Sequence, residues 1–193
     1  MPVATRLINV VMQKRFCTYC GEPTITAVPA GDSRPRRVCP ACQSVHYENP
    51  LIVVGCVPEY QGRILICRRA IEPRRGYWTV PAGFMENAET LEDGAARECL
   101  EEALAQVDIG TPLALVNVPE AGQVHVFFRA RMRSVAFGVG VESLETQLVE
   151  PAGIPWQDIA FPSTRYALEQ YLADRAAGTA GIHVTTLTRR DPG

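Results

Sequence analysis

One acidic stretch that begins with glycine decides the fold: residues 83–105 read GFMENAETLEDGAARECLEEALA. At 100° per residue, with Glu98 at zero, Glu101 falls near 300° and Glu102 near 40° on a helix. The three carboxylates therefore share one face. The opposite face carries side chains that can pack on a sheet: Ala96, Cys99, Leu100, Ala103 and Leu104. This pattern predicts an amphipathic helix over residues 90–105.

Signals around this helix predict the rest of the fold. Thr90 and Asp93 have the spacing of an N-terminal cap, in which the Thr hydroxyl accepts a first-turn N–H. A second helix is predicted over 164–177, with Gly178 as its stop. Strands are predicted from apolar runs bounded by turn residues: 51–58, 63–68, 112–118, 124–130 and about 146–149, with a hairpin turn at Gln61-Gly62. This order predicts an α/β (α+β) fold, a mixed sheet sandwiched by helices.

The composition is that of a globular protein. The chain has 193 residues, 47% of them apolar, which suits one core with a small appendage. The longest apolar run, 51–57, is far shorter than the roughly 20 residues of a membrane-spanning helix, and residues 1–16 lack the pattern of a secretory signal. The net charge of −2 offers no bulk attraction to nucleic acid or to an anionic membrane. We expect a cytoplasmic protein with neither as a partner.

Four of the seven cysteines form two C-x-x-C pairs, Cys17/Cys20 and Cys39/Cys42. Each pair can turn two sulfurs toward one ion, so the two pairs predict a tetrahedral, structural Zn²⁺ site. The segment between them is too poor in apolar residues to form a core alone. Chance pairs or a redox disulfide are the alternatives. His46 could replace one ligand, but a surface histidine or one that lies beside the ligands is the favoured interpretation. The remaining cysteines are expected to be buried thiols: Cys56, Cys67 and Cys99.

The three clustered glutamates predict a second metal site. Two unit charges about 6 Å apart repel by about 3 kcal/mol at an effective dielectric near 20, and a divalent cation turns this repulsion into binding. Oxygen ligands in an incomplete protein cage favour Mg²⁺ or Mn²⁺, which takes its remaining ligands from phosphates and water. Arg97 can pair with Glu101 or with Glu89. The alternative for three glutamates alone is a solvated helix face.

The whole spacing resembles the Nudix box, Gly-x5-Glu-x7-Arg-Glu-U-x-Glu-Glu-x-Gly-U, where U is aliphatic. The chain matches it at six positions: Gly83, Glu89, Arg97, Glu98, Glu101 and Glu102. It departs at the last glycine, which is Leu104 here. Because that glycine would end the helix in a left-handed conformation, this departure concerns the helix end and not a metal ligand.

The resemblance implies hydrolysis of a nucleoside diphosphate linked to a group X, by water attack on phosphorus. Glu98 and Glu102 would be the main Mg²⁺ ligands, Glu101 a further one, and the carbonyl of Ala82 a backbone ligand. Arg97 and Glu89 would be an orienting pair. The candidates to accept the proton of the water are Glu102 and two glutamates of a later loop: Glu142 and Glu145.

The cysteine module before Asn49-Pro50 is similar to that of the zinc-ribbon Nudix group, which includes FAD and ADP-ribose pyrophosphatases. ADP-ribose or FAD, with AMP as a product, is therefore the expected small-molecule substrate. NADH pyrophosphatases are the alternative, although their signature Ser-Gln-Pro-Trp-Pro-Phe-Pro is absent from 106–125. Related hydrolases also make a homodimer plausible. A different class remains open, a nucleotide-sensing regulator whose ribbon contacts nucleic acid through Arg34, Arg36 and Arg37.

Several residues are candidate substrate contacts. Arginines around the loop before the box are candidates for phosphate binding, namely Arg68 and Arg74 with their neighbours Arg69 and Arg75. Aromatic side chains are candidates for stacking on a base or flavin: Tyr77, Trp78, Phe127 and Phe128. The expected organisation is an N-terminal extension (1–15), a zinc ribbon (16–47), a Nudix hydrolase domain (48–180) and a C-terminal tail (181–193).

Overall fold

The computed structural model describes residues 15–188, and the chain divides into two compact units between Pro50 and Leu51. The expected N-terminal extension, apart from residue 15, and the last five residues of the expected tail lie outside the described residues. Within 15–188, no helix is long and apolar enough to cross a membrane.

The first unit is a small antiparallel sheet in the order β1-β2-β3, with strands Ile25–Ala27, Arg36–Val38 and Val45–His46. Among its described residues, 15–50, few side chains are buried: Cys17, Thr24, Cys39 and His46. Because this set contains no large aliphatic residue, hydrophobic burial alone stabilises the unit weakly. Two of the four buried residues, Cys17 and Cys39, are cysteines.

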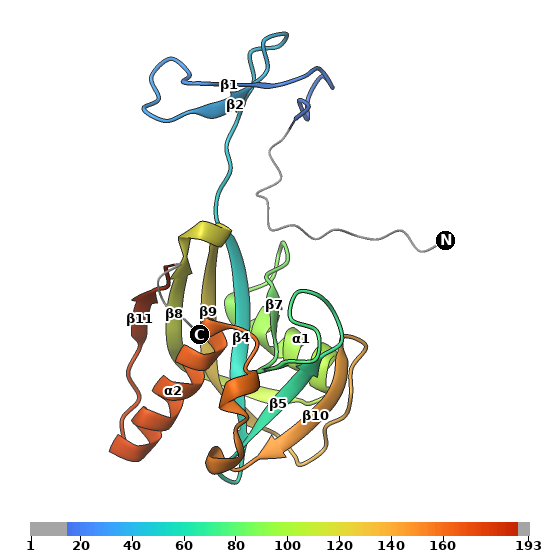
Figure 1. Cartoon of the computed structure of the whole chain (residues 1–193), viewed down its shortest axis with the longest axis vertical. Helices are drawn as coiled ribbons and strands as arrows, with labels where there is room; N and C mark the ends of the chain where they lie inside the picture. The colour runs from blue at the N-terminus through green and yellow to red at the C-terminus, as the bar shows by residue number, and fades with distance from the viewer. Residues whose placement is uncertain (1–14, 189–193) are drawn as a thin grey trace. The chain divides into compact units, whose positions relative to one another are not determined.

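The second unit is built on an eight-stranded mixed sheet (Figure 1). Its main path runs β10-β5-β4-β9-β8-β11, with β6 added to β5 and β7 to β4. The β4–β9 and β8–β11 pairs are parallel and the other pairs are antiparallel. The strands have these bounds: β4 Leu51–Tyr60, β5 Arg63–Arg69, β6 Trp78–Thr79, β7 Ala82–Phe84, β8 Val107–Val118, β9 Gln123–Met132, β10 Ser143–Val149 and β11 His183–Thr186.

Two helices cover opposite faces of this sheet: α1, Leu91–Ala103, and α2, Pro162–Ala177 (Figure 1). One core cluster joins α1 to the sheet through Ala95, Cys99 and Ala103, and a second joins α2 through Ala167, Leu168 and Tyr171. The expected α/β/α sandwich is confirmed, because each face of the sheet buries apolar side chains under one helix. Cys56, Cys67 and Cys99 are buried thiols of the α1 core, as predicted.

Thr90 caps α1 as its sequence predicts. Its Oγ1 accepts from the amide of Asp93 at 3.1 Å and donates to Asp93 Oδ2 at 2.9 Å. The helix ends at Ala103, two residues before the predicted end, because Leu104 takes the left-handed conformation at φ 49° and ψ 27°. Leu104 therefore does what the missing glycine would do, at the cost of strain that a β-carbon brings to this region.

The strand 112–118 was predicted too short. β8 begins at Val107 and runs through Pro112, where its register against β9 shifts. Proline lacks the N–H that a central strand needs, and in sheets it is common as the first residue of a strand. For this reason the sequence predicted that the strand begins at Pro112. The structure accommodates it because β11 pairs with β8 only over residues 114–117, so Pro112 needs a partner on one side only.

The predicted C-terminal tail is wrong in part, because residues 183–186 form β11, parallel to β8. Asp174 of α2 fixes this strand: its carboxylate pairs with Arg129 and with His183 Nε2, at 3.0 Å in the second case. Arg129 also donates to the carbonyl of Gly181 at 2.9 Å. A segment of four residues has too weak a hydrophobic pattern to be recognised as a strand in the sequence. The contacts with Arg129 and Asp174 that hold β11 in place are tertiary.

Candidate active site and metal centre

The three glutamates of the acidic helix face have different environments. Glu98 and Glu102 are buried, at 8% and 5% exposed, whereas the side chain of Glu101 is 57% exposed. The difference arises because β7 lies over the first two. Glu102 Oε2 accepts from the amide of Ala82 at 3.3 Å, which places Ala82, the predicted backbone ligand, beside this carboxylate.

Gly83 leaves the room that Glu98 needs. A methyl group at this position would lie 2.3 Å from Glu98 Oε1 and 2.4 Å from Cδ, far inside van der Waals contact. Gly94 has a similar role on the helix, because a methyl group there would lie 2.7 Å from Glu89 Oε1 and 2.8 Å from Val54 Cγ2. Two glycines thus let α1 approach the sheet and the loop before it closely enough to bury carboxylates.

Arg97 connects the glutamates, and both pairings that its position allowed are present. Its Nε and Nη2 contact the two carboxylate oxygens of Glu89 at 3.0 and 2.8 Å. Its Nη1 contacts Glu98 at 2.7 Å and Glu101 at 3.1 Å, and Nη2 also donates to the carbonyl of Phe84 at 3.1 Å. A bidentate pair of this kind fixes the direction of the guanidinium.

The electrostatics of the site favour a cation. Burial raises the pKa of Glu102 to about 8, and it raises the pKa of Glu98 against the opposing effect of Arg97. Hydrogen bonds from Arg97 lower the pKa of Glu89 to about 2. A buried carboxylate with a raised pKa is one whose charge lacks compensation, and a divalent ion supplies it.

The metal ligands that these three carboxylates offer are all oxygen atoms, which fits Mg²⁺ or Mn²⁺. The three carboxylates are nonetheless less tightly gathered than the cysteines of the first unit. Among residues 15–188, only those cysteines bring three or more side-chain ligand atoms within 4.8 Å of one another. The contacts of Arg97 with Glu98 and Glu101 account for this, because they turn two of the three carboxylates toward the guanidinium.

The two late glutamates lie in different surroundings. The negative charge of Glu142 contributes to raising the pKa of both Glu98 and Glu102, so it acts within electrostatic range of both. Glu145 instead lies opposite Arg68 in the β10–β5 pair, with Oε2 at 3.6 Å from Arg68 Nη1. Of the two, Glu142 is the one near the buried carboxylates.

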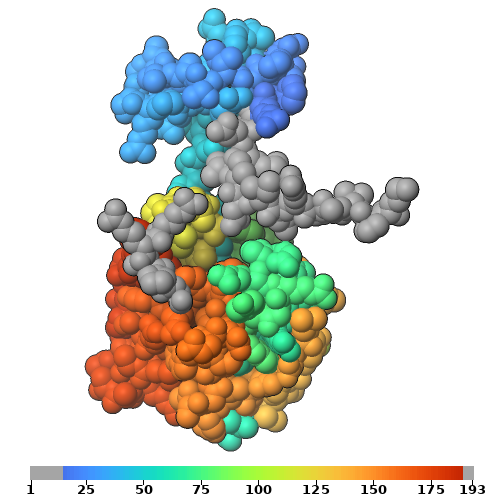
Figure 2. All heavy atoms as spheres, viewed as in Figure 1, coloured from blue at the N-terminus to red at the C-terminus, as the bar shows by residue number. Residues whose placement is uncertain are grey.

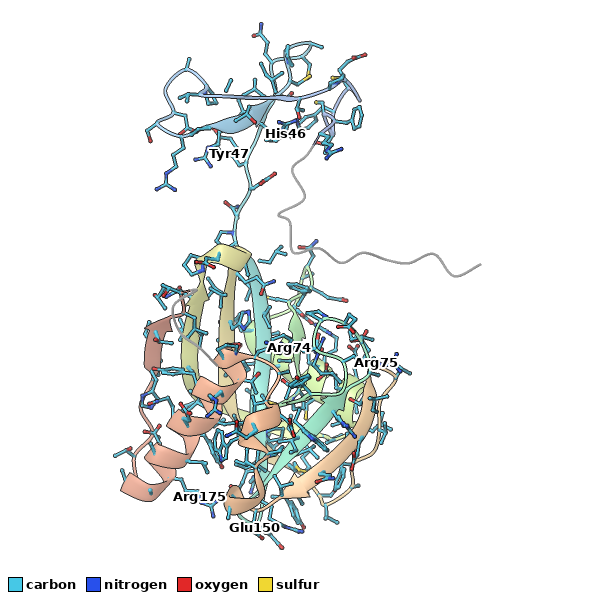
Figure 3. The ribbon with its side chains drawn as sticks, viewed as in Figure 1. His46, Tyr47, Arg74, Arg75, Glu150 and Arg175 are labelled. Atoms are coloured by element: carbon cyan, nitrogen blue, oxygen red, sulfur yellow. The ribbon has the colours of Figure 1, made fainter. Side chains whose placement is uncertain are left out.

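The candidate phosphate-binding arginines also differ. Arg68 is engaged with Glu145 and donates to the carbonyl of Gly76 at 2.8 Å. The loop after β5 exposes Arg74 and Arg75 (Figure 3), and Figure 2 shows the green part of the chain that contains this loop at the surface. The guanidinium of Arg74 lies 5.2 Å from the ring centre of Tyr77.

Arg69 was predicted only as a member of this arginine cluster. Its positive charge partly opposes the rise in the pKa of Glu102, so Arg69 lies within electrostatic range of the acidic cluster. Its Nε donates to the carbonyl of Pro73 at 2.9 Å, and its guanidinium lies 5.0 Å from the ring centre of Phe161. The alternation of side chains along a strand is the signal that separates it from Arg68, because Arg69 shares the parity of Cys67, which faces α1.

Three of the four aromatic candidates are corrected by the structure. Phe127 and Phe128 are 1% exposed, and Trp78 belongs to the core cluster under α2. Their rings are packed in the core, so no ring face is available to stack on a base or a flavin. Tyr77 is partly exposed and keeps its candidacy.

The four predicted zinc ligands come together in the first unit. The Sγ atoms of Cys17, Cys20, Cys39 and Cys42 lie within 4.8 Å of one another, with the Cys17–Cys42 and Cys20–Cys39 pairs at 3.6 and 3.5 Å. None of these thiols forms a disulfide. His46 (Figure 3) is not in the cluster. It is buried, its ring centre lies 5.8 Å from that of Tyr19 in a stacked arrangement, and its Nε2 has no hydrogen-bond partner among residues 15–188.

Comparison with known families agrees with both units. The Nudix domain family matches residues 49–165, and the family described as Nudix N-terminal, a zinc ribbon, matches residues 15–48. This chain belongs to the Nudix hydrolase family. The membership in the zinc-ribbon Nudix group that the sequence predicted is confirmed. The Nudix hydrolase of Nitrosomonas europaea, known from a crystal structure, is 45% identical with a TM-score of 0.85, over 90% of this chain and 99% of that one.

Two other similarities are more distant. The NAD-capped RNA hydrolase NudC of Edwardsiella ictaluri is 39% identical over 104 residues, which is 53% of this chain and 38% of that relative. The matched segment thus spans little more than a third of the curated relatives. An ADP-ribose pyrophosphatase from Streptococcus suis is 17% identical with a TM-score of 0.58, over 71% of this chain and 100% of that one. At this identity the likeness shows the fold alone.

Proposed function

We propose that this Nudix protein hydrolyses the pyrophosphate bond of a nucleoside diphosphate linked to X, with ADP-ribose or FAD as substrate and AMP as one product. The observation that carries the proposal is the pair of buried carboxylates, Glu98 and Glu102, on one face of α1. Burying two like charges side by side is unfavourable without a cation. A divalent cation at this place is what a pyrophosphate substrate requires.

Glu98 and Glu102 would hold Mg²⁺ or Mn²⁺, with Glu101 and the carbonyl of Ala82 as further ligands. The ion would neutralise phosphate oxygens and polarise water for in-line attack. Arg97 would position Glu98, since one guanidinium is fixed by Glu89 and touches Glu98 through Nη1. Arg69 would contact a phosphate from the side of β5.

Glu142 would accept the proton of the attacking water. In that step the water oxygen forms a bond to phosphorus, the bridging P–O bond breaks, and its electron pair leaves with the second phosphate. ADP-ribose would give AMP and ribose 5-phosphate, and FAD would give AMP and FMN. A positioned general base contributes about 10² to 10⁴-fold in rate. Glu145 is the weaker candidate because it is paired with Arg68.

The four cysteines would bind Zn²⁺ in a structural role. Four sulfurs complete a tetrahedral coordination sphere and leave no position for water or substrate. The low apolar content of the unit supports this role, because metal binding then supplies folding free energy that burial does not.

NAD-capped RNA is a second candidate substrate, because the curated relatives are NAD-capped RNA hydrolases. The ribbon exposes aromatic rings suited to stacking on unpaired bases: Phe16, Tyr19 and Tyr47 are 62%, 79% and 58% exposed. NAD-capped RNA and NADH therefore belong in the same substrate panel as ADP-ribose and FAD. The panel also tests the expectation that the protein has no nucleic-acid partner.

The test is kcat/KM for these four substrates with Mg²⁺, on the whole chain and on Glu102→Gln. We expect AMP release from ADP-ribose or FAD and a loss of at least 100-fold in Glu102→Gln. Tighter binding of RNA without turnover, lost when Arg34, Arg36 and Arg37 are changed, would instead indicate a nucleic-acid-binding regulator. Equal activity of the wild type and Glu102→Gln would refute the proposed function.

A further inference from the structure

The C-terminal end of α1 has an unusual cap, made by a distant segment of the chain. The amide of Gly138 donates to the carbonyl of Ala103 at 2.8 Å, and the amide of Gly140 donates to the carbonyl of Glu102 at 3.1 Å. Helix ends leave carbonyls without partners within the helix, and here residues more than thirty positions later satisfy two of them.

Gly140 fits this place only as glycine. A methyl group on it would lie 1.8 Å from the carbonyl oxygen of Glu101 and 2.9 Å from the carbonyl carbon of Glu102. These are backbone atoms of a helix, which cannot move aside as a flexible side chain does. Gly138 is less constrained, because a methyl group there would meet the end of the Leu104 side chain at 3.0 Å.

The same segment is fixed again just beyond Gly140. The amide of Ser143 donates to the carbonyl of Gly140 at 3.1 Å, and the amide of Ala70, after β5, donates to the carbonyl of Glu142 at 2.7 Å. Glu142 thus lies between an anchor on α1 and an anchor at the end of β5. One hydrogen bond connects its segment to the backbone of Glu102.

We infer that Gly140 is a positioning residue: its contact with the last turn of α1 sets the distance between the carboxylate of Glu142 and the carboxylates of Glu98 and Glu102. This inference rests on the proposed function. The close approach that glycine permits would be lost with any larger residue, and Glu142 would move away from α1 while the acidic cluster stayed in place. Misplacing a general base by about 1 Å costs on the order of 100-fold in rate.

The test is a double-mutant cycle of Gly140→Ala and Glu142→Gln on the whole chain. We expect Gly140→Ala to lower kcat for the best substrate at least tenfold, with KM within about twofold, because the substrate and metal contacts remain. In the Glu142→Gln background the same change should cost less than twofold, since the group being positioned is already lost. Gly153→Ala is the matched control, because a methyl group there would meet only Val149 Cβ at 3.9 Å.

Two results would overturn the inference: unchanged kcat in Gly140→Ala, or an equal loss with and without Glu142. If Glu102→Gln is inactive while Glu142→Gln is fully active, the inference fails and the proposed function stands. If Gly140→Ala does not fold by circular dichroism, Gly138→Ala replaces it. Its smaller loss of kcat should be restored by Leu104→Ala, which removes the atom that the new methyl group meets, and failure of this rescue would also count against the inference.

Discussion

The carboxylate of Glu98 occupies the space where a side chain on Gly83 would lie, with Oε1 only 2.3 Å from the position of a methyl group. Glycine is therefore required at the first position of the box motif because Glu98 needs the space, and not because of a turn, since Gly83 is not among the glycines with positive φ. β7 can lie over α1 only while this position has no side chain.

Gly83→Ala should push the Glu98 carboxylate out of its buried place. We expect kcat/KM to fall at least tenfold and the Mg²⁺ concentration for half-maximal activity to rise, because a metal ligand has moved. Steady-state assays at several Mg²⁺ concentrations measure both. Gly153→Ala serves as the control of equal chemistry. Wild-type Mg²⁺ dependence in Gly83→Ala would show that Glu98 does not need this space.

Arg97→Lys should keep the positive charge and lose the fork that contacts Glu89, Glu98 and Phe84 together. We expect a loss of activity of about ten- to a hundredfold with the fold retained, because the orientation of Glu98 depends on that geometry. Circular dichroism checks the fold and kcat/KM reports the effect. Arg165→Lys, whose pair with Glu169 lies on α2, is the control. Equal activity of Arg97→Lys and wild type would show that charge alone suffices.

Asp174 gives a pH dependence of stability. Hydrogen bonds from His183 and Thr179 and the charge of Arg129 hold its pKa below the ordinary 3.8. The folded state therefore favours the ionised form. This stability is present above the ordinary pKa and is lost as the pH falls through the folded value. We expect the difference in Tm between wild type and Asp174→Asn to have its full size near pH 6 and to shrink below about pH 4. A constant difference would contradict this assignment.

The cysteine cluster predicts one zinc ion per chain, measurable by elemental analysis of the purified protein. Cys39→Ser should abolish zinc retention, because three sulfurs leave the tetrahedron open. Cys67→Ser is the control, since this thiol lies in the α1 core and outside the cluster. Zinc retained by Cys39→Ser at wild-type stoichiometry would place the ion elsewhere.

The secondary structure around the acidic helix followed from short-range patterns. Thr90 and Asp93 predicted the cap, Gly178 predicted the end of α2, and its left-handed φ of 66° agrees. Strand ends were less accurate, as at Val107, and β11 was missed. A strand of four residues has little pattern of its own, and it exists because Asp174 and Arg129 fix the segment before it.

The candidate site shows the same division. Spacing alone placed Glu98, Glu101 and Glu102 on one face and the four cysteines around one point, because helix geometry and tight turns are set by local covalent structure. It gave no basis for choosing between Glu142 and Glu145. Nor did it separate Tyr77 from the buried Trp78, Phe127 and Phe128, since aromatic residues pack in cores as readily as they line sites.

The sequence by itself determined the family, the acidic face of α1 and the cysteine cluster, since the box motif and each C-x-x-C pair have short, fixed spacings. Only the tertiary structure decided which carboxylates are buried and how α1 ends. It showed that Leu104 replaces the missing glycine and that Gly138 and Gly140 complete the cap. The physical reason is that burial and capping here depend on backbone contacts between segments far apart in the chain, such as that of Gly140 with Glu102. Such contacts leave no periodic pattern in the sequence from which they could be predicted.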